Sequence, residues 1–295
     1  MSEFFGVPIQ GLMSQLLVGL INGSFYAILS LGLAIIFGLL NIINFAHGAQ
    51  YMMGAFLAWI GLRYFGINYW WALVVSPLLV GIFGIILERT MLKRLYHLDH
   101  LYGLLLTFGL ALIIEGVFRY FYGISGQPYG IPQALSGAYN LGFMSLPKYR
   151  GWVILASLVV CFVTWYVIER TKLGAYLRAG TENPKLLMAF GVNVPLLVTL
   201  TYGYGVALAA FAGVLAAPIF SVNPVMGSNL IIVVFAVVVI GGMGSILGSI
   251  VTGLGLGLIE GLTKVYYPEA SAVVVFVIMA IVLLVRPAGL FGREK

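Results

Sequence analysis

The sequence predicts an all-α fold: a polytopic membrane bundle with broken helices, about nine passes and a single domain over residues 1–295. Of its 295 residues, 62% are hydrophobic and only 8% are charged, whereas a soluble domain carries about a quarter charged residues. Several uncharged stretches reach the ~20 apolar residues that cross a bilayer core. Residues 4–62, for example, contain no Asp, Glu, Lys or Arg. These two observations place the chain in a membrane.

The apolar stretches also locate the individual spans. A single helix over 230–262 would be roughly 50 Å long, against a hydrocarbon core of ~30 Å. That segment contains the sequence GGMGSILG, and such a density of glycine breaks a helix. We therefore divide it in two and expect spans near 12–37, 45–62, 69–88, 102–122, 152–168, 196–219, 230–241, 246–262 and 271–286.

Basic residues orient this bundle. With nine passes, the C-terminal tail lies on the same side as 89–101 and 169–195, and that side carries ten Lys and Arg residues against five on the other. The positive-inside rule makes the richer side cytoplasmic, so we expect the N-terminus outside and the C-terminus inside. The longest connection, 122–150, then lies outside; it serves either as a plain loop or as a surface for a partner.

Composition also limits the chemistry. The net charge of +6 comes from residues at span ends, so we expect contact with membrane lipid and no binding of nucleic acid. The single cysteine, Cys161, permits neither a disulfide nor a cysteine metal site. No basic region precedes the first apolar run, so no cleaved signal peptide is expected. We expect no cofactor and no metal.

Small residues recur every four positions in three spans. One series is Gly19, Gly23 and Ala27, another runs from Gly205 to Ala217, and a third from Ser249 to Gly261. Such series let helix backbones approach closely in lipid. We therefore expect tight packing within the bundle.

The segment RAGTENPKLLMAFGVN, residues 178–193, interrupts this apolar chain. Asn183 can cap a helix that Pro184 begins, and Gly191 with Asn193 can end it. The resulting helix over 181–193 has an apolar face formed by Leu186, Leu187, Ala189 and Phe190. On position alone, it either rests on the membrane surface or docks into a groove of a separate cytoplasmic protein.

Four stretches resemble the permease subunits of ABC importers for branched-chain and other hydrophobic amino acids. They are NIINFAHGAQYMMGAF (41–56), RTKLGAYLRAGTENPKLLMAFGVN (170–193), VVVIGGMGSILGSIVTGLGLGLIE (237–260) and RPAGLFGR (286–293). Their order and spacing match over nearly the whole chain. The resemblance implies a multi-pass permease of the bacterial inner membrane, with 170–195 as the cytoplasmic coupling loop that contacts the ATPase. The coupling residues are then Thr181, Glu182, Asn183, Pro184, Leu186, Leu187, Phe190 and Gly191.

The resemblance also implies partners. The chain contains no Gly-x-x-x-x-Gly-Lys-Ser/Thr phosphate loop, so ATP hydrolysis belongs to cytoplasmic ATP-binding subunits and the chain itself is no enzyme. A second, homologous permease subunit and a periplasmic solute-binding protein complete the expected importer. 

Two positions depart from many family members. Ala49 replaces a Glu after the His-Gly pair, and Val233 lies near the place of a Lys. The Glu and the Lys are absent together, which is the pattern expected if an ion pair has been lost, because a buried charge needs a partner. The expected substrate is a branched-chain or hydrophobic amino acid, with a small organic acid or an amide as the alternative.

Polar residues at the start of the second span are candidates for the solute pathway. Asn41, Asn44, His47 and Gln50 lie at an expected helix break, and such backbone is tolerated at membrane depth only inside protein or along a cavity. They either satisfy one another at the break or line the passage. The glycines of the second break, Gly241, Gly242 and Gly244, are the remaining pathway candidates.

Two charged pairs and two other function classes complete the sequence predictions. Glu115 with Arg119 and Glu260 with Lys264 are spaced to pair on one helix face, as interfacial pairs or as contacts at the outer mouth. An ion-coupled secondary transporter would need titratable groups at the bilayer midplane, where only His47 stands. An intramembrane enzyme would need a nucleophile and a base that the spans do not offer.

Overall fold

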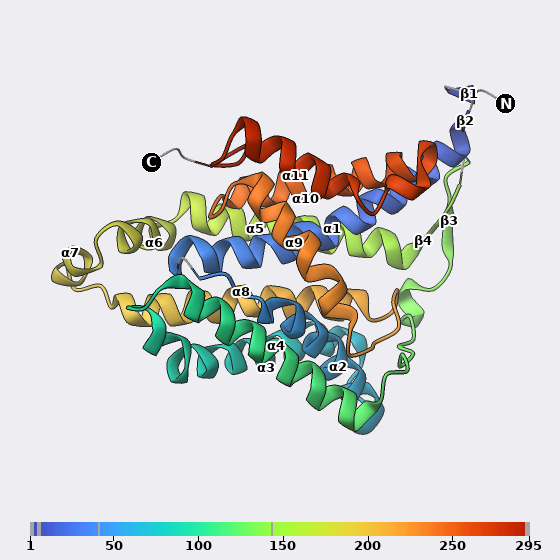
Figure 1. The fold of residues 1–295 in the computed structure, drawn as a ribbon. Helices are drawn as coiled ribbons and strands as arrows, with labels where there is room; N and C mark the ends of the chain where they lie inside the picture. The colour runs from blue at the N-terminus through green and yellow to red at the C-terminus, as the bar shows by residue number, and fades with distance from the viewer. Residues whose placement is uncertain (1–2, 5–6, 41, 143, 293–295) are drawn as a thin grey trace.

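The computed structural model describes residues 3–4, 7–40, 42–142 and 144–292. Within them, nine helices form the bundle (Figure 1): α1 (Ile9–Leu40), α2 (Ala46–Phe65), α3 (Tyr69–Thr90), α4 (His100–Tyr122), α5 (Lys148–Arg170), α8 (Val194–Ala216), α9 (Met226–Gly241), α10 (Ile246–Tyr266) and α11 (Val274–Val285). Two more helices, α6 (Lys172–Glu182) and α7 (Pro184–Ala189), project from one end of it. The short elements are β1 (Glu3–Phe4), β2 (Val7–Pro8), η1 (Leu92–Leu95), η2 (Gln133–Leu135), β3 (Ala138–Asn140), β4 (Ser145–Pro147) and η3 (Pro268–Ala270).

Every predicted span coincides with one of the nine bundle helices, so the polytopic helical fold is confirmed. Six of the described helices are long and apolar enough to cross a membrane, and α9 and α11 are shorter apolar helices. The predicted break in 230–262 is present, because α9 ends at Gly241 and α10 begins at Ile246. The number of passes and the sidedness stay predictions.

Helix α1 runs through the centre of the bundle between α10 and α8 (Figure 1). The small-residue series explain this closeness. A Cβ placed on Gly23 would lie 3.0 Å from the carbonyl oxygen of Leu254 in α10, and one on Gly32 would lie 2.7 Å from that of Gly205 in α8. The backbones therefore touch where a larger side chain would hold them apart.

Polar side chains cap the starts of five of the described α-helices: α3, α4, α7, α8 and α10. Asn183 accepts a hydrogen bond from Leu186 N (3.0 Å) and Asn193 one from Leu196 N (3.1 Å). Ser245 accepts one from Gly248 N (3.1 Å) at the start of α10. These side chains satisfy amide groups that a helix start leaves free.

The connection between α4 and α5 contains short ordered elements. Residues 123–147 contain η2 and the antiparallel pair β3–β4, and Gln127 forms an isolated β-bridge with Val222 in the loop after α8. The sequence predicted a plain loop or a partner surface here but not the β3–β4 pair, because hairpin pairing depends on contacts that composition does not specify. Figure 1 places β3 and β4 at the end of the bundle opposite α6 and α7.

Candidate functional site

The break before α2 gathers the polar residues that the sequence singled out. Residues 42–44 are not helical, and Asn44, His47 and Gln50 are fully buried. Asn44 Nδ2 donates to Gln50 Oε1 (3.1 Å), and His47 Nε2 donates to the carbonyl oxygen of Leu29 in α1 (3.0 Å). The structure thus brings three of the four predicted residues together, while Asn41 lies outside the described residues.

A threonine that the sequence analysis missed ties this break to α4. Thr107 Oγ1 accepts from Phe45 N (3.2 Å) and lies 3.1 Å from the carbonyl oxygen of Ile43, to which it can donate. Non-helical backbone inside a membrane protein needs such a partner. Nothing in the sequence around Thr107 marks it, because its partner lies 62 residues away.

Other polar atoms at the same place have no partner among the described residues. Asn44 Oδ1, His47 Nδ1, Gln50 Nε2 and the Tyr51 hydroxyl are buried without a hydrogen bond. His47 and Tyr51 face α9 across a gap that is too small to admit water; the gap is also lined by Leu29, Gly48, Leu230, Ile231 and Val234. Mutual satisfaction, one of the two sequence interpretations, is therefore incomplete here.

The second group of pathway candidates lies elsewhere. Gly242 and Gly244 adopt φ values of +99° and +85° in the turn between α9 and α10. The C-terminal segment covers this turn, since Leu290 N donates to Ile240 O (2.8 Å). A Cβ on Gly244 would lie 3.2 Å from Gly38 Cα near the end of α1, whereas His47 contacts Leu29. Along α1, nine residues correspond to roughly 14 Å.

The two groups of pathway candidates therefore lie at different levels along α1, and their assignment to the solute pathway stays a prediction. Gly241 packs its backbone against Gly248, where an added Cβ would lie 2.7 Å from the carbonyl carbon. Together with the positive φ of Gly242 and Gly244, this close approach explains why the motif needs glycine. These glycines shape a turn at the end of α9, and the polar residues before α2 lie deeper in the bundle.

The segment 178–193 folds as two helices, which corrects the single helix predicted over 181–193. Thr181 and Glu182 belong to the last turn of α6. Asn183 caps α7, Pro184 is its first residue, and Gly191 follows it with a φ of +84°. The proline explains the division, because it cannot donate the amide hydrogen bond that would continue α6.

The apolar face of α7 also needs correction. Leu187 is only 7% exposed, and a Cβ on Gly180 would lie 3.5 Å from its Cδ2. Leu187 therefore packs inward against α6. Leu186 and Phe190 are 55% and 77% exposed, and Met188, which the sequence analysis did not select, is 45% exposed. The apolar residues that α7 and its C-terminal end leave exposed are Leu186, Met188, Ala189 and Phe190.

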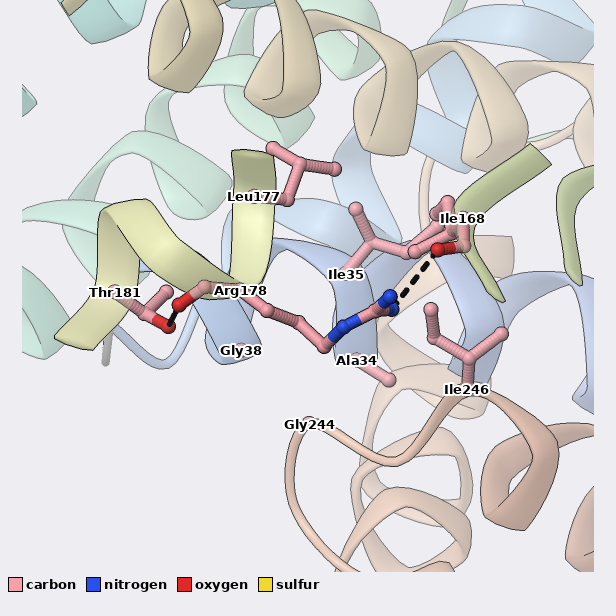
Figure 2. Close-up of a pocket in the computed structure, with 9 residues that line it drawn as sticks. All are labelled: Ala34, Ile35, Gly38, Ile168, Leu177, Arg178, Thr181, Gly244 and Ile246. Atoms are coloured by element: carbon pink, nitrogen blue, oxygen red, sulfur yellow. Dashed lines mark hydrogen bonds between the residues drawn. The ribbon is translucent and has the colours of Figure 1, made fainter. Parts of the chain in front are cut away.

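Helix α6 joins this projection to the bundle. A small cavity of about 80 Å³ lies between the end of α1, the end of α5, α6 and the turn after α9 (Figure 2). Arg178 of α6 crosses it and donates from Nη1 to the carbonyl oxygen of Ile168 (3.0 Å), with Glu169 3.5 Å away. Helix α6 therefore lies beside α1, α5 and the glycine turn at the same time, and a displacement of α6 would change its packing against all three.

Glu88 is a buried carboxylate that the sequence analysis passed over. It is 1% exposed near the end of α3, where Tyr96 Oη donates to Oε1 (2.5 Å) and Thr199 Oγ1 of α8 donates to Oε2 (2.7 Å). Burial and the hydrogen bond to Glu88 raise the pKa of Tyr96 well above its usual value, so its hydroxyl remains a donor. This cluster fixes the α3–α4 connection to the start of α8.

The two predicted charge pairs are formed. Arg119 contacts Glu115 at 2.6 Å and Lys264 contacts Glu260 at 2.5 Å. Each pair has a further partner on another helix: Ser228 of α9 donates to Glu115 (2.6 Å) and Tyr26 of α1 donates to Glu260 (2.8 Å). In the described part of the chain, no group of three His, Cys, Asp or Glu residues is placed to hold a metal ion.

The sequence that forms these apolar helices, the broken helix start and the projecting helical pair matches a known family. Residues 15–284 match the family described as the permease component of branched-chain amino acid transport systems. The chain belongs to this family. It is accordingly a permease and a multi-pass protein of the inner membrane, as the resemblance in the sequence predicted.

Curated relatives of this permease cover almost its whole length. The high-affinity branched-chain amino acid transport system permease protein BraD of Pseudomonas aeruginosa is 31% identical over 96% of both chains. LivH of Salmonella typhimurium, a protein of the same description, is 29% identical over 96% of both chains. LivM of Escherichia coli is 26% identical over 92% of this chain and 68% of its own length. No solved structure matches the permease significantly.

Proposed function

We propose that this chain is the membrane permease of an ATP-driven importer, and that α6 and α7 form the coupling module on which an ATP-binding subunit acts. The membership in the permease family carries the transport function. The exposed apolar face of α7, at the end of a bundle whose own sequence lacks a phosphate loop, carries the proposal of a separate ATPase.

The contacts of α6 explain how docking would reach the solute pathway. A partner holding Leu186, Met188 and Phe190 would move α7, which packs on α6 through Leu187. Helix α6 abuts α5, because a Cβ on Gly174 would collide with the carbonyl oxygen of Ile168. Helix α8 starts directly after α7, at Val194. The outer residues of α7 thus connect to two bundle helices.

Phe190→Ala tests this proposal. Aromatic anchors often contribute 2 kcal/mol or more to an interface, so copurification of the ATP-binding subunit should weaken by at least about tenfold. Uptake should fall while ATP hydrolysis continues uncoupled. The permease should remain folded and inserted, because Phe190 is 77% exposed.

Ile124→Ala is the matched control, since Ile124 is 74% exposed at the opposite end of the bundle. Leu187→Ala serves as a second control: it should lower the stability of the coupling module instead of selectively removing the contact. Wild-type copurification and coupled uptake in Phe190→Ala would show that α7 rests on the membrane surface and would overturn the docking proposal.

For the cargo, we propose a branched-chain or hydrophobic amino acid or a chemically related small solute. The relatives named for branched-chain amino acid transport support this. The departures at Ala49 and Val233 keep a small organic acid or an amide as the alternative. In this fold, Ala49 of α2 belongs to the main core, and Val233 of α9 packs against the cluster that contains Tyr26 and Val275.

The proposed assembly includes a second, homologous permease subunit and a periplasmic solute-binding protein. The existence of both LivH and LivM among the relatives supports two kinds of permease chain. An ion-coupled secondary transporter is the rival class; it predicts uptake driven by an ion gradient without ATP. Uptake into vesicles that contain ATP but no gradient distinguishes the two.

A further inference from the structure

Resting on the proposed transport function, we propose that the gap between α2 and α9 is the solute-binding site. We further propose that its polar contacts are His47 Nδ1 and the Tyr51 hydroxyl, and that it accepts solutes of zero net charge. Zwitterionic amino acids and primary amides share this chemistry, whereas carboxylate anions do not.

The first support is the position of the two unpartnered polar atoms. His47 and Tyr51 are 0% exposed, both line the gap, and neither His47 Nδ1 nor Tyr51 Oη has a partner among the described residues. An unpartnered buried polar atom costs ~1–3 kcal/mol. Elsewhere the fold supplies hydrogen-bond partners to buried polar groups, because both carboxyl oxygens of Glu88 and the hydroxyl of Thr107 are hydrogen-bonded.

The second support is the hydrogen-bonding pattern that the gap offers. Because the Leu29 carbonyl only accepts, Nε2 of the neutral His47 ring carries the proton and Nδ1 is left as an acceptor. The Tyr51 hydroxyl can donate. A solute with an N–H group beside a carboxylate or carbonyl oxygen would satisfy both atoms at once, and an amino acid or an amide has that pair of groups.

The third support is the absence of formal charge from the walls. Helices α1 and α9, and α2 up to Leu62, contain no Asp, Glu, Lys or Arg in the sequence. A solute with a net charge would be held at membrane depth without a counter-charge, at a cost of several kcal/mol. A zwitterion or an amide brings no net charge, so the gap distinguishes solutes by their polar end.

The contact between α2 and α9 allows the gap to open. The two helices meet at Gly48 and Gly227, where an added Cβ on Gly48 would lie 2.6 Å from the Gly227 carbonyl oxygen. The two backbones meet directly here, and the side chain nearest to the Cβ position of Gly48 is that of Ile231, whose Cβ is 3.1 Å away. Few side chains must therefore change rotamer when α9 moves away from α2. At its other end α9 continues into the turn at Gly242, which adopts a φ of +99°.

A cysteine on the α9 wall reports on this gap without removing either polar contact. Cys161 is the only cysteine of the chain, so Cys161→Ser gives the background. In that background, Val234→Cys lines the gap, whereas Ala236→Cys lies on the same helix with equal burial but packs toward Tyr26. Both variants are assembled into the whole importer and treated with a charged thiol reagent, at rest and during ATP hydrolysis.

We expect Val234→Cys to react at least about tenfold faster during hydrolysis, with no change for Ala236→Cys. Leucine and isovaleramide should slow the labelling severalfold. Isovalerate, which has the carbon skeleton of isovaleramide but a net negative charge, should not. Adding His47→Leu and Tyr51→Phe should abolish the protection. This last arm separates the gap from the selectivity of a solute-binding protein, which is unchanged.

Labelling of Val234→Cys that is insensitive to all three solutes, or equal protection by isovalerate, would overturn the inference. So would unchanged protection in the His47→Leu, Tyr51→Phe variant. The proposed function is tested separately by uptake of radiolabelled leucine and isovaleramide in the Cys161→Ser importer. An importer that moves solute while Val234→Cys stays insensitive contradicts only the site.

Discussion

The polar cluster around Glu88 and the polar cluster around His47 are both buried, and both connect membrane helices. At Glu88, which is 1% exposed, two hydroxyl groups donate to the two carboxyl oxygens, so both oxygens have a hydrogen-bond partner. At His47, one ring nitrogen is bonded and the other is not, and Tyr51 beside it has no partner among the described residues. Burial of a polar residue therefore does not by itself distinguish a structural role from a role in transport. Whether its hydrogen bonds are made within the fold is the more informative observation.

The largest loss of folded protein is expected at Gly242. A substitution there acts through the backbone conformation and involves neither of the two polar clusters, so it gives a reference for their effects. Gly242→Leu combines a φ of +99° with a Cβ only 2.5 Å from Gly292 N, so the C-terminal segment must be displaced. A positive φ alone costs about 1–2 kcal/mol for an L-residue, and the collision adds to it. We expect most of the folded permease to be lost, as measured by size-exclusion chromatography of the detergent extract.

Gly255→Leu is the control for that change, since nothing lies within 4 Å of a Cβ at Gly255 and it is also a glycine of this region. Its folded yield should stay near that of the wild type. Normal folding and uptake in the double variant Gly242→Leu, Gly244→Leu would remove the special role given to this turn.

Glu88→Ala tests the satisfied cluster. Removing the carboxylate leaves the Tyr96 hydroxyl without its partner and Thr199 Oγ1 with only the Pro195 carbonyl oxygen (3.0 Å). A buried polar group left without a partner costs ~1–3 kcal/mol, and the lost packing of a buried side chain adds to this. The apparent melting temperature in detergent should fall clearly, and uptake should fall in proportion to folded protein. A Glu88→Ala permease with wild-type stability and no uptake would instead show that Glu88 takes part in transport, and would contradict its assignment to packing.

Thr107→Val measures the part of the His47 region that serves packing. The valine keeps the shape but leaves the Phe45 amide and the Ile43 carbonyl without the threonine hydroxyl, at a cost of ~1–3 kcal/mol. We expect a moderate drop in melting temperature, smaller than for Glu88→Ala. Thr107→Ser, which keeps the hydroxyl, should recover most of the difference.

Tyr51→Phe should have the smallest effect on stability. It therefore separates a role in transport from a role in packing most clearly. Its hydroxyl is buried without a partner, and removing it should leave the melting temperature unchanged or raise it slightly. Uptake should nevertheless fall several-fold if the hydroxyl contacts the solute. A loss of stability like that of Thr107→Val would mean that Tyr51 serves packing.

Much of this permease could be predicted from its sequence. Apolar runs of the length of a bilayer core located all nine bundle helices, because in lipid a helix must satisfy its own backbone. The glycines of 241–248 located the break after α9, and Asn183 with Pro184 located the start of α7. These are local signals: each depends on residues within a few positions of the feature it predicts.

The tertiary structure decided what depends on residues far apart in the chain. It turned Leu187 inward against α6, placed Thr107 of α4 on the break before α2, and separated the Gly242 turn from His47. It also divided the buried polar residues into a cluster whose hydrogen bonds are made and one in which they are left open. No local pattern contains this information, because a hydrogen bond between two helices is set by how their backbones meet, and here glycine contacts between distant segments decide that.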